Sequence, residues 1–180
     1  MEEMEIPTEH LQEAIHEKAE EEKEKWVLWV ALSTAFMAVL AAIAGLLGGH
    51  HVNEALIDQI KSSDQWAYYQ AKGIKAEIAA STDKILQAIP GQSGKGDSLS
   101  KQNLARYEKE KEEIKKNAEE HEKMSDEHLV KHVTLSKAVT IFQIAIAISA
   151  IAILTRKRIL WFTGILLTLA GAVFLLLGIL

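Results

Sequence analysis

The sequence contains no cysteine and only two prolines among its 180 residues. The lack of cysteine excludes disulfides, thiolate metal ligands and cysteine nucleophiles. Three apolar stretches, residues 26–49, 138–154 and 159–180, contain no ionisable side chain. Ion-coupled transporters and proton relays place ionisable groups in such stretches, so this class of function is not expected. No region is strongly basic overall and the net charge is −5, so nucleic acid is not an expected partner either.

The three apolar stretches have the length and composition of membrane-spanning helices. They comprise 24, 17 and 22 residues in chain order. A helix rises by about 1.5 Å per residue, and the hydrocarbon core to be crossed is about 30 Å thick. Trp26 and Trp29 lie where an interfacial aromatic belt is expected. The sequence therefore predicts an all-α membrane protein with three transmembrane helices.

Polar segments fill the rest of the chain. We expect an acidic N-terminal helix over residues 1–25 and a basic turn over residues 155–158. Residues 50–137 form what we call the arm, a long antiparallel helical hairpin of coiled-coil type between the first and second transmembrane helices. Its turn is predicted at residues 90–98, where Pro90 and Gly91 break the helical pattern.

Orientation follows from the distribution of positive charge. Arg156, Lys157 and Arg158 form the one short basic loop, which the positive-inside rule assigns to the cytoplasm. With three spans, the N-terminus is then cytoplasmic and the arm lies outside. The lysines of the arm argue the opposite way, but the arm exceeds the roughly 60 residues to which the rule applies.

Each half of the arm carries a stripe of residues spaced alternately by three and four, as in a coiled coil. The isoleucine stripe of the first half consists of Ile57, Ile60, Asp64, Ala67, Ala71, Ile74, Ile78, Ser81, Ile85 and Ala88. The stripe of the second half consists of Leu104, Tyr107, Lys111, Ile114, Ala118, His121, Ser125, His128, His132 and Leu135. We expect the two stripes to pack on each other. Both are thin, so we also expect the arm to pack against other copies or a partner.

Small residues form one face of the first apolar stretch. This small-residue face consists of Ala31, Ala35, Ala38, Ala42, Gly45 and Gly49. Such a face lets transmembrane helices approach closely, because lipid supplies no hydrophobic drive for their association. Gly164, Thr168, Gly171 and Gly178 give the last stretch a small face too. Gln143, in the second stretch, is expected to form an interhelical hydrogen bond, with a pore-lining role as the alternative. Whether the neighbours belong to the same chain or to another copy stays open.

The chain resembles a known bacterial family in three places. These are EIPTEHLQEAIHEKAE before the first span, GHHVNEALIDQIKSSDQWAYYQAKGIKAEI after it, and the three-span layout, with DQWAYYQAK as the most specific string. The family is catalogued as domain of unknown function 4337. The resemblance implies a bacterial inner-membrane protein and brings no activity, cofactor or catalytic residue with it.

Aromatic residues gather in the most specific string of this resemblance. Trp66, Tyr69 and Gly73 share one helix face, and Tyr68 lies on another. Large aromatic side chains beside an alanine stripe can close over a helix–helix contact. The patch is open to three interpretations: packing within the hairpin, docking of another copy or a partner, or binding of a small ligand.

Histidines concentrate in the part of the arm nearest the membrane. Folding the arm about its turn predicts that Glu54 lies near His132, Asp58 near His128, and Asp64 near His121 or Met124. Imidazole and carboxylate groups suit divalent metal ions. The candidate metal ligands are His50, His51, Glu54, His128 and His132. A pH-sensitive packing layer and ordinary hydrogen-bonded packing are the alternatives.

These features favour a structural or interaction protein over an enzyme. We expect a homo-oligomer of three-span subunits that acts as a scaffold through its arm, with no cofactor. Its expected partners are the lipid bilayer, other copies of itself and a protein that docks on the arm or the N-terminal helix. An oligomeric channel or mechanically gated pore, and an accessory subunit of a larger membrane complex, are the alternatives.

Overall fold

The computed structural model describes residues 8–89 and 97–180, and it describes side chains from residue 25 to 89 and from residue 102 to 180. The described residues form three helices, α1 (Thr8–Ala88), α2 (Asp97–Thr155) and α3 (Arg158–Ile179), and no strand. Each of the three contains a stretch long and apolar enough to cross a membrane. The prediction of an all-α chain with three long apolar helices is therefore confirmed.

The helices are longer than the predicted segments. α1 is one helix of 81 residues, so it contains the first apolar stretch and the first half of the arm without a break. α2 has 59 residues and joins the second half of the arm to the second apolar stretch. The predicted turn at residues 90–98 lies mostly outside the described residues, which end at residue 89 and resume at Asp97.

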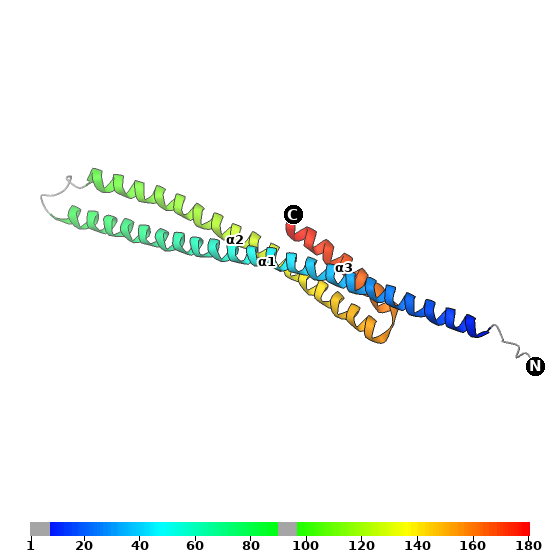
Figure 1. The fold of residues 1–180 in the computed structure, drawn as a ribbon. Coiled ribbons are helices and arrows are strands. Elements are labelled where there is room, and N and C mark those ends of the chain that lie inside the picture. Colours follow the sequence, from blue (N-terminus) through cyan, green and yellow to red (C-terminus); the bar gives the residue numbers. More distant parts are fainter. Residues whose placement is uncertain (1–7, 90–96) are drawn as a thin grey trace, which may run out of the picture. The chain divides into compact units, whose positions relative to one another are not determined.

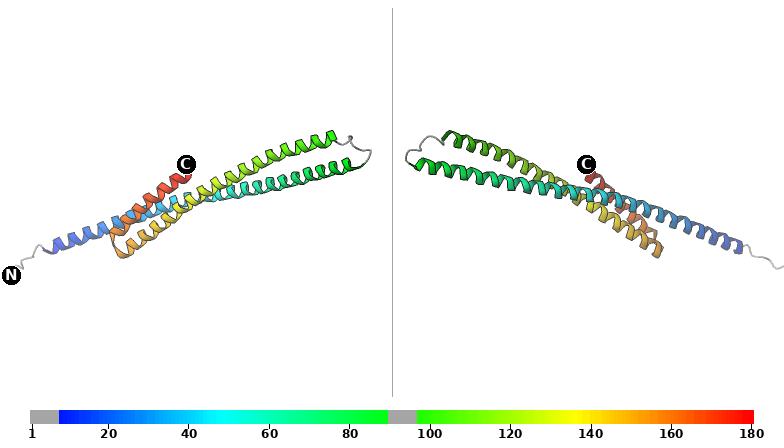
Figure 2. Two further views of the ribbon diagram at one scale, coloured as in Figure 1. Left: turned by 180° about the vertical axis from the view of Figure 1, so that it is seen from behind. Right: turned by 60° about the vertical axis from the view of Figure 1, so that its left-hand side comes forward.

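Contacts divide the chain into two compact units. The first unit comprises Met1–Gly48 and Val133–Leu180, and the second comprises Gly49–His132. In the first unit, parts of α1, α2 and α3 lie beside one another (Figure 1). In the second unit, the later part of α1 and the first part of α2 lie side by side in all views (Figures 1 and 2).

A small apolar core joins the three helices of the first unit. Its cluster combines Ala44 of α1 with Leu135, Ala138 and Phe142 of α2 and Leu175 of α3, all at most 8% exposed. Polar bonds supplement this packing, since the indole N–H of Trp161 donates to the Ser33 hydroxyl over 3.1 Å. The fully buried Phe142 is the largest of these core side chains.

Glycines of α3 give α2 the room to approach. A Cβ at Gly171 would lie 2.9 Å from the Phe142 ring, and one at Gly178 would lie 2.6 Å from Leu135 Cγ. At Gly164 it would meet the Ser149 hydroxyl at 2.6 Å and the Ala145 carbonyl at 3.2 Å. These glycines of the predicted small face of the last stretch therefore pack against α2 of the same chain.

The second unit has a narrow core of small and polar residues. From α1 it buries Ala55, Asp58, Ser62 and Ala76, and from α2 it buries Ile114, Ala118 and Ser125. The α2 residues belong to the predicted stripe of the second half of the arm, so that part of the prediction is confirmed. The α1 residues belong to a different face from the predicted isoleucine stripe.

The predicted packing of the isoleucine stripe within the hairpin is wrong. Every member of the stripe is exposed in the structure. Small side chains allow two helices to pack more closely than isoleucine does, and the buried hydrogen bonds of Asp58 and Ser125 favour the same face. The helix face that packs is therefore the one with small and polar side chains, and not the one with the larger apolar side chains.

Candidate interaction sites

A layer of polar contacts joins α1 and α2 in the second unit. The Ser125 hydroxyl donates to the Ala55 carbonyl over 2.9 Å, and the Nδ1 atom of His121 lies 3.0 Å from Asp58 Oδ1. The Nδ1 atoms of His51 and His128 are 2.9 Å apart. Asp58 and Ser125 are buried, so this layer satisfies polar groups that would be costly to leave unpaired.

The layer differs in register from the predicted one. Asp58 was expected opposite His128 and instead contacts His121, seven residues away along the sequence. The same shift leaves His128 opposite His51. The predicted register was wrong because it was obtained by folding the arm about the middle of its turn, and the position of a turn alone does not determine which residues pair. The observed alignment brings the buried Asp58 carboxylate to His121 and the Ser125 hydroxyl to the Ala55 carbonyl.

The electrostatics of the layer favour a neutral His51 and an ionised Asp58. Burial lowers the pKa of His51, and the nearby His128, Lys131 and His50 lower it further, against a raising effect of Glu54. Burial by itself raises the pKa of Asp58, but hydrogen bonds from His121 and Lys61 lower it overall. The Asp58 carboxylate therefore accepts charge-assisted hydrogen bonds in a buried position.

The predicted metal ligands are only partly brought together. His51 and His128 are in contact, and the His50 ring centroid lies 5.6 Å from that of His51. Within residues 25–89 and 102–180, no group of three or more histidine, aspartate or glutamate side chains is arranged to hold a metal ion. The geometry thus gives no support to a metal site built from the five predicted ligands. Metal binding stays a prediction.

The aromatic patch lies among cationic side chains from both helices. Trp66 and Tyr69 make an edge-to-face contact with centroids 5.6 Å apart. Lys111 Nζ lies 5.2 Å from the Tyr69 ring centroid, and Lys72 Nζ lies 5.2 Å from that of Tyr68. Such cation–π contacts contribute roughly 0.5–1 kcal/mol at exposed sites. Much of the patch is therefore used within the chain, while Tyr68 stays 48% exposed.

An ion pair continues this cluster. Lys72 forms a salt bridge with Glu110, which raises the pKa of Lys72 and lowers that of Glu110. Gly73 was predicted to share a helix face with Trp66 and Tyr69. A glycine is not sterically required there, because a Cβ would meet only Lys111 Cε at 4.0 Å.

The isoleucine stripe is an apolar feature that the second unit leaves uncovered. Ile60, Ile74, Ile78 and Ile85 are 60–63% exposed. Isolated exposed apolar residues are ordinary, whereas a stripe that keeps heptad spacing is typical of helices that pack on a further helix.

The small-residue face of α1 is largely exposed in the single chain. Its members from Ala31 to Gly45 are exposed, although Ala31 also lines a cavity of the first unit. Instead Val30, Met37 and Ala44 contact the rest of the first unit. Gln143 is exposed as well. The hydrogen bonds found among the described residues do not include its amide, so its predicted interhelical bond stays a prediction.

One feature of the first unit escaped the sequence prediction. A cavity forms beside Trp26, between the beginning of the first apolar stretch and the turn that joins α2 to α3. Arg156 of this turn has a positive φ of 55°. The aromatic residue and the basic turn are both visible in the sequence, but only the packing of the three helices shows that they line one cavity.

One protein family matches most of the chain. A family model described as a domain of unknown function (DUF4337) matches residues 26–180. The chain belongs to this family. The match contains all three apolar stretches and the whole arm, and it confirms the resemblance seen in the sequence. No curated protein and no solved structure matches the chain.

Proposed function

We propose that this DUF4337 protein is a membrane-anchored, homo-oligomeric scaffold, without enzymatic activity, whose arm associates through its isoleucine stripe. The three apolar stretches span the bacterial inner membrane. The arm is an antiparallel hairpin on the periplasmic side, and the N-terminus and the Arg156–Arg158 turn lie in the cytoplasm. This location follows from the lengths of the apolar helices and from the positive-inside rule.

The antiparallel arrangement of the arm is supported by its contacts. Residue numbers rise along α1 while those of the contacting α2 residues fall, from His51 with His128 to Lys72 with Glu110.

The observation that carries the proposal is the exposure of the complete isoleucine stripe. A side chain such as isoleucine contributes about 1.5–3 kcal/mol when it is fully buried. Covering the four most exposed isoleucines would therefore stabilise an assembly by several kcal/mol per copy. The hairpin core consists of alanine, serine and aspartate with Ile114 as its one large apolar side chain among the described buried residues, so it offers little apolar burial of its own. Association thus supplies the burial that a single arm lacks.

The membrane part supports the same proposal independently. The small-residue face is exposed in the single chain and has the spacing that lets transmembrane helices pack closely. Gln143 lies on the exposed part of α2, where its amide can pair with another copy.

Site-directed cross-linking tests the proposal without the removal of native cysteines, because the chain has none. All copies share one orientation in the membrane, so equivalent residues of paired stripes come together. Ile85→Cys should give a disulfide-linked dimer under mild oxidation in native membranes. Lys84→Cys is the matched control, since the neighbouring residue is also exposed but lies about 100° away around the helix.

Equal cross-linking at both positions would indicate random collision and would refute the stripe as an interface. A cross-link from Ile85→Cys to a different protein would refute self-association through the stripe and would favour an accessory subunit of a larger complex.

A further inference from the structure

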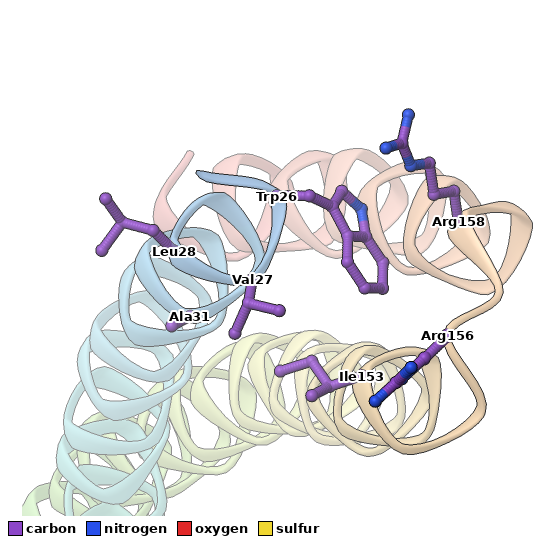
Figure 3. A pocket seen from close by; sticks show the side chains of 7 residues that line it. All are labelled: Trp26, Val27, Leu28, Ala31, Ile153, Arg156 and Arg158. Carbon is purple, nitrogen blue, oxygen red and sulfur yellow. The ribbon is translucent and has the colours of Figure 1, made fainter. Parts of the chain in front are cut away.

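The cavity of the first unit combines an apolar wall with a polar end. Its volume is about 680 Å³, within the range of about 300–1,000 Å³ that is typical of small-molecule sites. The wall is formed by Val27, Leu28 and Ala31 of α1 and by Ile153 of α2. In Figure 3 the Trp26 ring extends from α1 toward the turn that carries Arg156 and Arg158.

The polar groups that line the cavity are hydrogen-bond donors. The indole nitrogen of Trp26 is buried and has no hydrogen-bond partner among the described residues. An indole N–H only donates, and so does a guanidinium group. Arg156 lines the same cavity, and none of the lining residues that the structure describes carries a carboxylate. A ligand that pairs with the Trp26 N–H and the Arg156 guanidinium must therefore present acceptor oxygens and negative charge.

The backbone of Arg156 supports a functional role for this residue. Its φ of 55° lies in the left-handed region, which is unfavourable for residues other than glycine. Glycine would make the same helix end without strain. A strained arginine that lines a cavity is typical of a ligand site rather than of a turn selected for stability.

The geometry points to a binding site for an anionic phospholipid. The phosphate accepts hydrogen bonds from Trp26 and Arg156, and the attached chain lies along Val27, Leu28 and Ile153. The inference rests on the proposed membrane insertion, because Trp26 and Arg156 flank apolar stretches and lie at the depth of lipid headgroups. Free phosphate lacks the apolar part that the wall would contact.

Native mass spectrometry of the full chain, released from nanodiscs of mixed phosphatidylglycerol and phosphatidylcholine, tests this inference. The wild-type chain should retain phosphatidylglycerol in preference to phosphatidylcholine. Arg156→Gln should lower the retention of phosphatidylglycerol about tenfold or more, because a hydrogen bond to a charged group is lost. Trp26→Phe keeps the ring and removes only the N–H, and it should lower retention in the same direction.

Lys157→Gln is the matched control, because it removes the same charge from the same turn at a residue that does not line the cavity. Its retention of phosphatidylglycerol should stay within about threefold of wild type. Equal losses in Arg156→Gln and Lys157→Gln would overturn the site in favour of general electrostatic attraction. Displacement of the lipid by millimolar inorganic phosphate would overturn the choice of a phospholipid.

Carbonate extraction of membranes separates this inference from the proposed membrane insertion. If the wild-type chain stays in the membrane pellet but retains no phosphatidylglycerol, the lipid site is refuted while insertion stands. If the chain is extracted by carbonate, insertion itself fails.

Discussion

The contact between His51 and His128 limits how many protons this pair can carry. Their Nδ1 atoms are 2.9 Å apart, so one must donate and the other must accept. If both rings were protonated, two donors would face each other and Lys131 would add a third positive charge nearby. Glu54 opposes this repulsion only in part. The observed contact between His51 and His128 is therefore compatible with a neutral or singly protonated pair of imidazoles.

Acidification should consequently destabilise the arm. The pKa of His51 is lower in the fold than its ordinary value of 6.5, so the stability that it contributes is complete above that pH and is lost as the pH falls below it. The pKa of Asp58 is lowered too, so its contribution disappears only at a more acidic pH, below its ordinary value of 3.8.

Thermal unfolding followed by circular dichroism at pH 7.5 and pH 5 measures this effect, with a lower melting temperature expected at pH 5. His128→Gln should reduce the difference between the two pH values, because a neutral amide replaces the second imidazole. His132→Gln is the control, since it removes an imidazole from the same helix other than the one whose Nδ1 atom lies 2.9 Å from that of His51. An unchanged pH difference in His128→Gln would contradict the assigned role of the pair.

The glycines of α3 determine how closely this helix approaches α2. Gly164→Ala would place its Cβ 3.2 Å from a backbone carbonyl, which cannot move as a flexible side chain does. We expect a destabilisation of roughly 1–3 kcal/mol, the typical cost of overpacking. Gly73→Ala is the control, since its Cβ would meet only Lys111 Cε at 4.0 Å and alanine is the better helix former by up to about 1 kcal/mol.

Unfolding in mixed micelles with increasing dodecyl sulfate measures both glycine variants. A Gly164→Ala variant as resistant as wild type would show that α3 does not pack on α2 as described.

The same elements show how far the sequence predicted the structure. The three apolar helices and the stripe of α2 were predictable, because that stripe places Ile114, Ala118 and Ser125 on one face and the structure buries them. α1 was ambiguous, since it has an isoleucine stripe and a second face with Ala55 and Asp58. Periodicity favours the larger apolar residues, whereas close packing and a buried carboxylate select the smaller ones.

The cavity beside Trp26 was not predictable from spacing for a related reason. Its lining comes from the beginning of the first apolar stretch and from residues around position 155, more than 100 residues later in the chain. Only the packing of three helices brings these residues together. An aromatic residue at one end of a span and a basic turn after another span were the available signals.

In the whole molecule, the isoleucine stripe of the arm and most of the small-residue face of α1 are left uncovered. A single chain buries its polar layer and the glycines of α3, but it leaves the isoleucine stripe exposed. In an assembly of identical chains these surfaces gain partners without any change within the subunit. The central claim is therefore that the functional form is a homo-oligomer held together through the arm.

The mass of the full chain extracted in a mild detergent tests this claim most directly, by light scattering corrected for bound detergent. The wild-type particle should contain two or more copies. The double variant Ile74→Lys and Ile78→Lys should shift it toward the monomer, because roughly 3–6 kcal/mol of burial per copy is lost. The double variant Gln59→Lys and Gln70→Lys adds the same charge at exposed positions outside the stripe and should leave the mass unchanged. A monomeric wild-type particle, or an oligomer that both double variants leave intact, would contradict the account.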